Sequence, residues 1–326
     1  MQTTFTRRDL IDRNRLRALM QRSDLAGVLQ LGSHLGAIAV SGTLLWQTWG
    51  SWVAVPVFIV HGVLLNFLYA AQHELSHGTV FRTKWPNRVF GRAIGFLMIF
   101  ARDFDWIQHS AHHQWTQDWE KDGELAREPY TLRSYLLWLS GLMYWWTRVT
   151  RMLRLARGIV LEPYVRPDQH GLVVAEARWH LAGYAAVAVL SLAAGSWAAV
   201  ILWLAPMVAM KPVHQLQNTI EHLGLSHEPD IFRNTRSTRT NALMRWLCWQ
   251  MPYHTAHHAF PSVPFWRLKE LDAELRDNGA APYAMGWIEF QIAVIAKLWA
   301  KDESQYPYDE VWIVSTPKGP RKLETA

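Results

Sequence analysis

This 326-residue chain has little cysteine and, over two long stretches, no charge. Its single cysteine, Cys248, excludes a disulfide framework, a zinc site built from thiolates and an iron–sulfur cluster held by this chain alone. The chain has 33 Lys and Arg and 27 Asp and Glu, yet residues 25–72 and 179–210 contain none of them. A soluble protein does not leave such windows uncharged, whereas a bilayer core requires about 20 consecutive apolar residues. The sequence therefore predicts an integral membrane protein, and we expect no nucleic-acid partner.

The N-terminus lacks the features of a secretory signal, because residues 1–24 carry six Arg and no apolar run. Residues 7–25 instead show the pattern of a basic amphipathic helix lying against an anionic membrane surface. A solvated helix explains the same pattern equally well.

Each uncharged window contains the tripeptide GSW, at 50–52 and at 195–197, which breaks the apolar run. Two hairpins place all 33 Lys and Arg on one face of the membrane, as the positive-inside tendency requires. A single long helix in the second window would place 13 of them on the opposite face. We therefore expect an all-α integral membrane protein with four transmembrane helices in two hairpins, with spans at about residues 26–49, 52–72, 179–194 and 197–214.

The rest of the chain is predicted to form a cytosolic helical cap from residues 73–178 and 215–300, followed by a polar tail, 301–326. Residues 1–326 then form a single domain of the cytoplasmic membrane, with both termini and the active site in the cytosol. Residues 89–101 are apolar but too short to cross, which indicates a half-inserted or buried helix.

Residues 131–158 combine many Trp and Leu with an arginine at every third position near the end of the segment. This pattern favours a helix in the headgroup layer, and an ordinary core helix with a charged face is the alternative. The arginines are Arg148, Arg151 and Arg154, and the tryptophans expected at the interface are Trp138, Trp145 and Trp146.

Nine of the fifteen histidines fall in four short groups: HELSH (73–77), HSAHH (109–113), NTIEH (218–222) and HTAHH (254–258). Because residues i, i+3 and i+4 share one face of a helix, H-x-x-x-H presents two imidazoles together and H-x-x-H-H presents three. Each group follows closely on the end of a predicted span or lies in the cap. We therefore expect all four groups to converge on the cytosolic side.

Isolated histidines in apolar helices are ordinary core residues, and His34 and His61 are interpreted in this way. Nine clustered imidazoles are different, because burying them without a metal leaves donors and acceptors unpaired or like charges repelling. The groups therefore predict a metal centre. No role is assigned to the remaining histidines, His170, His180, His214 and His227.

HELSH by itself is the H-E-x-x-H motif of zinc metalloproteases. A zinc ion takes three or four protein ligands, whereas nine histidines and an asparagine supply two five- or six-coordinate ions. An intramembrane zinc protease also leaves both H-x-x-H-H groups unexplained, and it stays a distant alternative. Glu74 is then interpreted as a residue that orients a ligand imidazole rather than as a general base. Imidazole suits zinc, copper and iron alike, so the nitrogen ligands do not identify the metal.

HELSH, HSAHH and HTAHH, in this order, resemble the three histidine boxes of the membrane fatty acid desaturase and hydroxylase superfamily. NTIEH is similar to that superfamily's additional ligand segment, and MPYHTAHHAFPSVPFWRL (251–268) is similar to the last box of its acyl desaturases. The resemblance covers about residues 25–275. It implies a non-haem di-iron site whose ligands are His73, His77, His109, His112, His113, His222, His254, His257 and His258, with Asn218 acting through a water.

The resemblance also implies an oxidoreductase with two iron ions that uses O₂ as cosubstrate to attack an unactivated C–H bond. Electrons then come from a separate ferredoxin, rubredoxin or b-type cytochrome that docks on the basic cap, because this chain has no haem-attachment motif. Membrane lipids surround the spans, and the expected substrate is a lipid or acyl chain.

The leading interpretation is desaturation of a fatty acyl chain or lipid, based on the third box and the Phe260-Pro261 that follows it. A hydroxylase or ketolase acting on an alkyl, carotenoid or small-metabolite C–H bond is the alternative, because EHLG (221–224) resembles a segment of the membrane alkane hydroxylases. A non-catalytic metal-binding protein requires only the histidines and leaves the order of the boxes unexplained.

Overall fold

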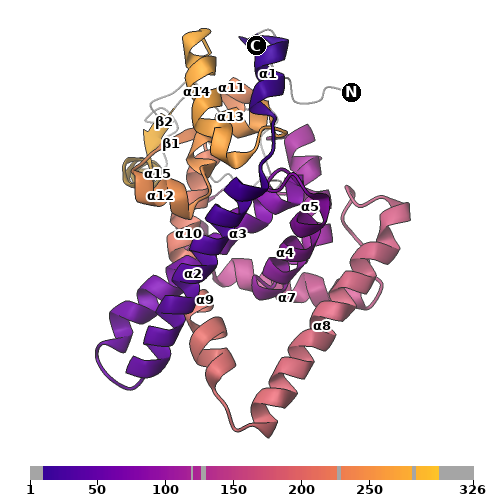
Figure 1. The fold of residues 1–326 in the computed structure, drawn as a ribbon, viewed down its shortest axis with the longest axis vertical. Helices are drawn as coiled ribbons and strands as arrows, with labels where there is room; N and C mark the ends of the chain where they lie inside the picture. The colour runs from indigo at the N-terminus through magenta and orange to yellow at the C-terminus, as the bar shows by residue number, and fades with distance from the viewer. Residues whose placement is uncertain (1–9, 119, 126–129, 226–228, 281–283, 301–326) are drawn as a thin grey trace.

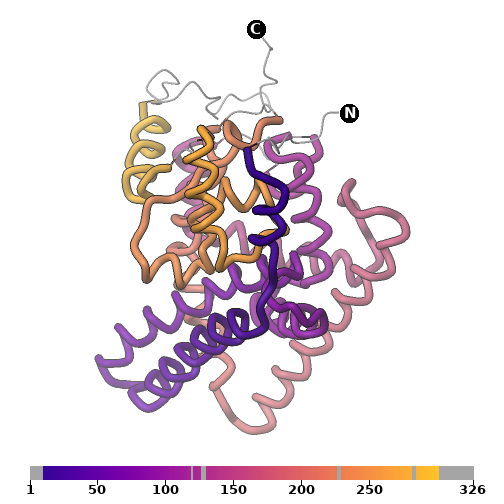
Figure 2. The backbone as a smooth tube through the Cα atoms, turned by 45° about the horizontal axis from the view of Figure 1, so that its top comes forward, coloured from indigo at the N-terminus to yellow at the C-terminus, as the bar shows by residue number. Residues whose placement is uncertain are grey.

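The structure is a computed structural model that describes residues 10–118, 120–125, 130–225, 229–280 and 284–300. Helices dominate it, and two helical hairpins project from a helical cap (Figure 1). Within the described ranges the one sheet is a parallel pair of strands, β1 (Ser237–Arg239) and β2 (Ala284–Gly286). The N-terminal helix and the C-terminal helices lie together at the end of the cap away from the hairpins (Figures 1 and 2).

The first hairpin pairs α2 (Asp24–Thr48) with α3 (Ala54–His77). Ser23 caps α2 by accepting a hydrogen bond from the Ala26 amide. Helix α3 ends at Gly78, whose φ of 67° is the left-handed conformation that favours glycine at a helix C-terminus. Both helices are long and apolar enough to cross a membrane. Since α3 continues to His77, its last turns carry the first histidine pair into the cap.

The second hairpin pairs α8 (His170–Ala193) with a broken return limb. The return limb is a π-helical turn (Val200–Leu204) followed by α9 (Ala205–Ala209) and α10 (Lys211–Asn218). The chain reverses at Gly195, where φ is +57°, so the second uncharged window folds as a hairpin and not as one long helix. Among the described helices only α2 and α3 meet the length and hydropathy expected of a span, and the four-span topology stays a prediction.

Polar side chains of α3 tie the two hairpins together. His61 Nε2 lies 2.8 Å from the carbonyl oxygen of Leu202 in the π-helical turn. Asn66 donates to the carbonyl oxygen of Met207 at 2.9 Å. A π-turn and a proline both free backbone carbonyls that need a donor in an apolar environment, and α3 supplies it.

His34 of α2 performs a similar structural role. The indole of Trp249 donates to His34 Nδ1 at 3.0 Å, and His34 Nε2 lies 3.0 Å from the carbonyl oxygen of Leu64. The interpretation of His34 and His61 as satisfied core histidines is confirmed.

The cap combines helices from two parts of the chain. The first part contributes α4 (Lys84–Leu97), α5 (Arg102–Gln114), α6 (Leu132–Leu139) and α7 (Leu142–Ala156). The second contributes α11 (Ile231–Asn234), α12 (Ala242–Leu247), α13 (His254–Ala259), α14 (Leu268–Asp277) and α15 (Trp287–Ala300). Short 3₁₀ turns at 167–169, 219–221, 251–253 and 265–267 join them.

The predicted headgroup helix at 131–158 is two helices, α6 and α7, separated by Gly141 with φ of +76°. Trp146 is exposed as expected, but Trp138 and Trp145 pack against buried clusters. Arg148 lies over the ring of Phe100, 3.1 Å from its centroid. The inner face of this segment therefore belongs to the protein core and the prediction of one helix is wrong, whereas a place in the headgroup layer stays a prediction.

The N-terminal segment also packs on protein. Helix α1 (Arg13–Leu19) buries Leu19 completely, and Arg15 forms ion pairs with Glu270 and Glu274 of α14. Its apolar side is therefore occupied by the cap, and the prediction of a membrane-surface helix is wrong for residues 10–19. The predicted tail, 301–326, lies outside the described residues.

Candidate metal centre

Four segments bring the nine clustered histidines together. His73 and His77 lie on the last turns of α3, and α5 carries the HSAHH box. His222 follows the 3₁₀ turn at 219–221, and α13 carries the HTAHH box. The expectation that the four sequence groups converge is confirmed by the contacts among their rings.

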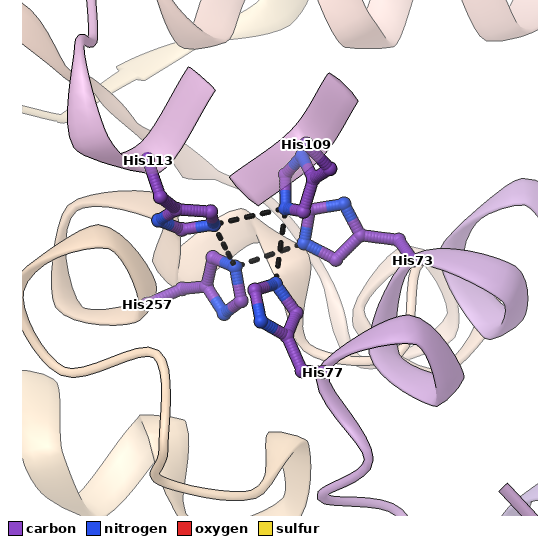
Figure 3. A group of neighbouring side chains, drawn as sticks. All are labelled: His73, His77, His109, His113 and His257. Atoms are coloured by element: carbon purple, nitrogen blue, oxygen red, sulfur yellow. Dashed lines mark hydrogen bonds between the residues drawn. The ribbon is translucent and has the colours of Figure 1, made fainter. Parts of the chain in front are cut away.

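The first group contains five imidazoles that could hold one metal ion (Figure 3). Nε2 of His73 lies 2.8 Å from Nε2 of His257, and Nε2 of His109 lies 3.0 Å from Nε2 of His77. His113 connects these two pairs, because its Nε2 lies 2.9 Å from Nε2 of His109 and 3.2 Å from Nε2 of His257. These five nitrogens point at one small space.

The second group contains His112, His222 and His258, whose ligand atoms also lie within 4.8 Å of one another. Nε2 of His222 lies 3.2 Å from Nε2 of His112 and 2.7 Å from Nε2 of His254, so His254 adjoins this group. The rings of His113 and His258 stack with centroids 4.2 Å apart, which makes the two groups neighbours.

Acidic side chains behind the imidazoles set their orientation. His109 Nδ1 lies 2.8 Å from a Glu124 carboxylate oxygen, and His112 Nδ1 lies 2.9 Å from Asp122. A carboxylate that accepts from Nδ1–H fixes the tautomer in which Nε2 offers its lone pair to a metal. Glu74 lies 3.5 Å from His257 Nδ1 without forming a hydrogen bond to it, so its interpretation as an orienting residue stays a prediction.

Burial keeps several of these imidazoles neutral. It lowers the pKa of His109 and His113, and neighbouring imidazoles lower it further. The pKa of His254 falls to about 3 for the same reasons. Burial also opposes the charged form of His112, but the carboxylates of Asp122 and Glu124 outweigh it and raise that pKa to about 9.

The donor set fits a metal ion in each group. An imidazole nitrogen carries either one hydrogen or one lone pair, so Nε2 of His109 cannot satisfy two neighbouring Nε2 atoms at 2.9 and 3.0 Å by hydrogen bonding alone. The ligand atoms of each group lie within 4.8 Å of one another, which is compatible with one ion at metal–nitrogen distances of about 2.1 Å. Five nitrogens exceed the four ligands of a structural zinc site, and imidazole also suits iron.

A cavity of about 60 Å³ adjoins both groups. His73 and His109 of the first group line it, together with His112 and His222 of the second. Asn218 lines it as well, and its amide donates to Glu221 at 3.3 Å. Asn218 therefore shares a cavity with ligands of both groups, and its action through a water stays a prediction.

Asp122 and Glu124 are site residues that sequence reasoning missed. They lie in the loop after α5, where no periodicity marks them. Asp122 accepts hydrogen bonds from the backbone amides of Gln117, Glu124 and Leu125, so it holds this loop against His112. The available signal was a polar segment directly after a histidine box, 115–125, that carries four acidic residues, and the sequence does not show which two face the histidines.

Comparison with known proteins agrees with this centre. A family model described as fatty acid desaturase matches residues 48–290, which include all nine histidines. The protein is thus an oxidoreductase of the desaturase type. It belongs to the fatty acid desaturase family.

Individual relatives are distant. The chain is 21% identical over 273 residues to an sn-1 oleoyl-lipid 12-desaturase of Picosynechococcus sp., covering 77% of this chain and 76% of that protein. It is 24% identical over 254 residues to an sn-1 oleoyl-lipid 12-desaturase of Arthrospira platensis, with 67% of each chain covered. It is also 24% identical over 269 residues to a dihydrorhizobitoxine desaturase of Bradyrhizobium elkanii, covering 73% of this chain and 72% of that protein.

Proposed function

We propose that this protein is an O₂-dependent desaturase that binds two iron ions through its nine clustered histidines. The observation that carries the proposal is the pair of neighbouring groups of inward-pointing imidazole nitrogens in a chain of the desaturase family. One iron takes the first group and the other takes the second group with His254. Asn218 acts on the second iron through a water. The ligands are His73, His77, His109, His113 and His257 for one iron and His112, His222, His254 and His258 for the other.

Two bound irons supply the reductive activation of O₂ that makes an unactivated C–H bond reactive, which no side chain achieves by proton abstraction. The protein holds the imidazoles in the required tautomer through Glu124 and Asp122. In the metal-free protein, burial raises the pKa of Glu221, on the wall of the metal-facing cavity, to about 8. Electrons arrive from a separate ferredoxin, rubredoxin or b-type cytochrome.

The proposed location is the membrane, with four spans and a cytosolic cap. Large apolar side chains are exposed on both hairpins, and a contiguous exposed apolar surface marks a membrane contact. The exposed apolar side chains include Val40, Leu44, Trp46, Trp49, Trp52 and Val55 on the first hairpin and Val189, Leu190, Leu192 and Trp197 on the second.

The proposed substrate class is an aliphatic acyl chain. The relatives named as oleoyl-lipid 12-desaturases support it, because the chain matches them over two thirds of their length or more. The reaction removes two hydrogens from neighbouring carbons and leaves a double bond.

The zinc-protease alternative conflicts with the geometry of Glu74. A general base must reach water and substrate, whereas the Glu74 side chain is completely buried and lies behind His257.

The test compares cells that express the wild-type protein with cells that express His109→Ala, by mass spectrometry of lipids and soluble metabolites. We expect a product that lacks two hydrogens in the wild type alone, and two irons per chain in the purified wild-type protein. A product that gains one oxygen would change the assignment to hydroxylase. Wild-type protein that binds no iron after reconstitution would overturn the di-iron proposal.

A further inference from the structure

A second cavity, of about 100 Å³, adjoins the metal-facing one and differs from it in lining. The two cavities share Tyr69, Glu124 and Asn218 as a common wall. The second cavity contains no metal-ligand histidine in its lining and extends under α6 and α7. Its contents therefore lie next to the metal centre without touching the ligands.

Three residues that line this second cavity each carry a buried donor that has no hydrogen-bond partner within the described part of the chain: the Trp138 indole N–H, the Tyr144 hydroxyl and Nη1 of Arg148. Tyr144 is only 5% exposed. A buried donor without a partner is energetically costly, so three such residues beside one small space indicate a ligand that accepts hydrogen bonds.

Arg148 brings a positive charge to the same space. Its guanidinium lies over the Phe100 ring, and no ion pair of Arg148 with a described carboxylate accompanies it. The lining contains one carboxylate, that of Glu124, and His109 engages it. The cavity therefore complements an oxyanion.

We propose that this second cavity binds the carboxylate of the substrate, and that the substrate is a short free carboxylic acid rather than an acyl chain esterified to a lipid. The inference rests on the proposed desaturase function. An ester carbonyl carries no charge to match Arg148, whereas a free carboxylate offers two acceptor oxygens to the three donors.

The sizes of the two cavities agree with a short chain. They measure about 100 and 60 Å³, and a protein cavity of about 150 Å³ holds one benzene molecule. A carboxylate in the second cavity then places only the first few carbons of the chain beside the histidines. The C–H bonds that react lie close to the acid group.

Binding of three six-carbon probes to the purified, iron-loaded protein tests this proposal by calorimetry, without turnover. The probes are hexanoate, its neutral methyl ester and hexyl phosphate. We expect hexanoate to bind and methyl hexanoate to bind at least about tenfold more weakly, because a charge-assisted contact is lost. Equal binding of the acid and the ester would overturn the proposal. Tighter binding of hexyl phosphate would overturn the carboxylate assignment in favour of a phosphorylated substrate.

Substitutions of two arginines on α7 test whether hexanoate binds in the second cavity. Arg148→Gln should weaken hexanoate binding about 10- to 100-fold. Arg151→Gln is the matched control, because Arg151 lies on the same helix over the Phe104 ring and outside the cavity lining. Unchanged hexanoate binding in Arg148→Gln would overturn the site.

Two milder variants keep the test decisive if Arg148→Gln fails to fold. Tyr144→Phe and Trp138→Phe each remove one donor and keep an aromatic ring, and each should weaken hexanoate binding about three- to tenfold. Retention of wild-type affinity by both would also contradict the proposal. The iron content of each sample separates the two hypotheses: two irons per chain without acid selectivity defeats this inference alone, and absent iron defeats the proposed function.

Discussion

The two histidine groups share helices α5 and α13 but are built differently. The first is a closed set of five imidazoles, whereas the second has three mutually close imidazoles with His254 beside them. Asn218 and Glu221 line the cavity next to the second group, and Glu221 lies 3.8 Å from His254 Nδ1. An ion with five imidazole ligands has about one free position in six-coordination, and an ion with four has about two. The second group is therefore the more open one, and the first is the more rigid support.

The largest effects should come from removing one ligand of each group. His77→Ala and His222→Ala should each reduce desaturation to background, because the proposed chemistry requires both irons. Each purified variant should retain about one iron per chain instead of two, as measured by metal analysis. Retention of two irons by His222→Ala would contradict the division into two groups.

Removing the supporting carboxylates should have the next largest effect. Glu124→Gln and Asp122→Asn should each weaken iron binding about 10- to 100-fold, because a neutral amide oxygen accepts the Nδ1–H hydrogen bond more weakly than a carboxylate does. Asp122→Asn should be the more harmful, since Asp122 also accepts three backbone amides of its loop. Competition with a chelator measures both affinities, and a larger loss in Glu124→Gln would reverse the expected order.

Acid should distinguish the two groups. Because the pKa of His112 in the iron-free protein is raised to about 9, iron must displace a proton from it at any lower pH. The lowered pKa values of His109 and His113 leave those ligands unprotonated near neutral pH.

Iron in the second group should therefore weaken about tenfold per pH unit below pH 9, and it should dissociate first on dialysis from pH 9 to pH 5. Metal analysis should pass through a plateau of one iron per chain. Asp122→Asn removes the main charge that raises the His112 pKa, so its affinity should depend less on pH. Simultaneous loss of both irons from the wild type would contradict this difference.

Asn218→Ala should have the smallest effect. Asn218 is proposed to act through a water, so its loss removes one hydrogen bond of about 0.5–1.5 kcal/mol. Turnover should fall about three- to tenfold while two irons remain. Asn218→Asp, which keeps the shape of the side chain and adds a negative charge, is the companion variant. Loss of iron in Asn218→Ala would show that Asn218 is a more direct ligand than proposed.

The sequence was informative about which histidines meet, because helical spacing alone places His109, His112 and His113 on one face. The sequence could not show which of these three histidines belongs to which metal-binding group. His112 joins the second group while His109 and His113 join the first, and that division depends on side-chain directions that no residue spacing encodes. The hairpins were equally readable, because a long charge-free window interrupted by a glycine is typical of two apolar helices joined by a turn.

Features that depend on tertiary packing could not be read from the chain. Arg148 has the spacing of a headgroup-layer arginine, yet the structure places it over Phe100 and against a cavity. Arg15 belongs to a segment with the pattern of a membrane-surface helix, yet it pairs with acidic residues more than 250 positions later in the chain. In both cases a partner distant in sequence decides the environment, and local pattern carries no information about that partner.

The distance along the chain between metal ligands has a consequence for biosynthesis. His73 and His257 are neighbours in space but 184 positions apart in sequence, and the first group is incomplete until α13 has folded against α3 and α5. Both hairpins emerge from the ribosome before that helix does. A metal ion in the first group could therefore be held by all five imidazoles only after synthesis has passed the last histidine box, when both apolar hairpins have already been made.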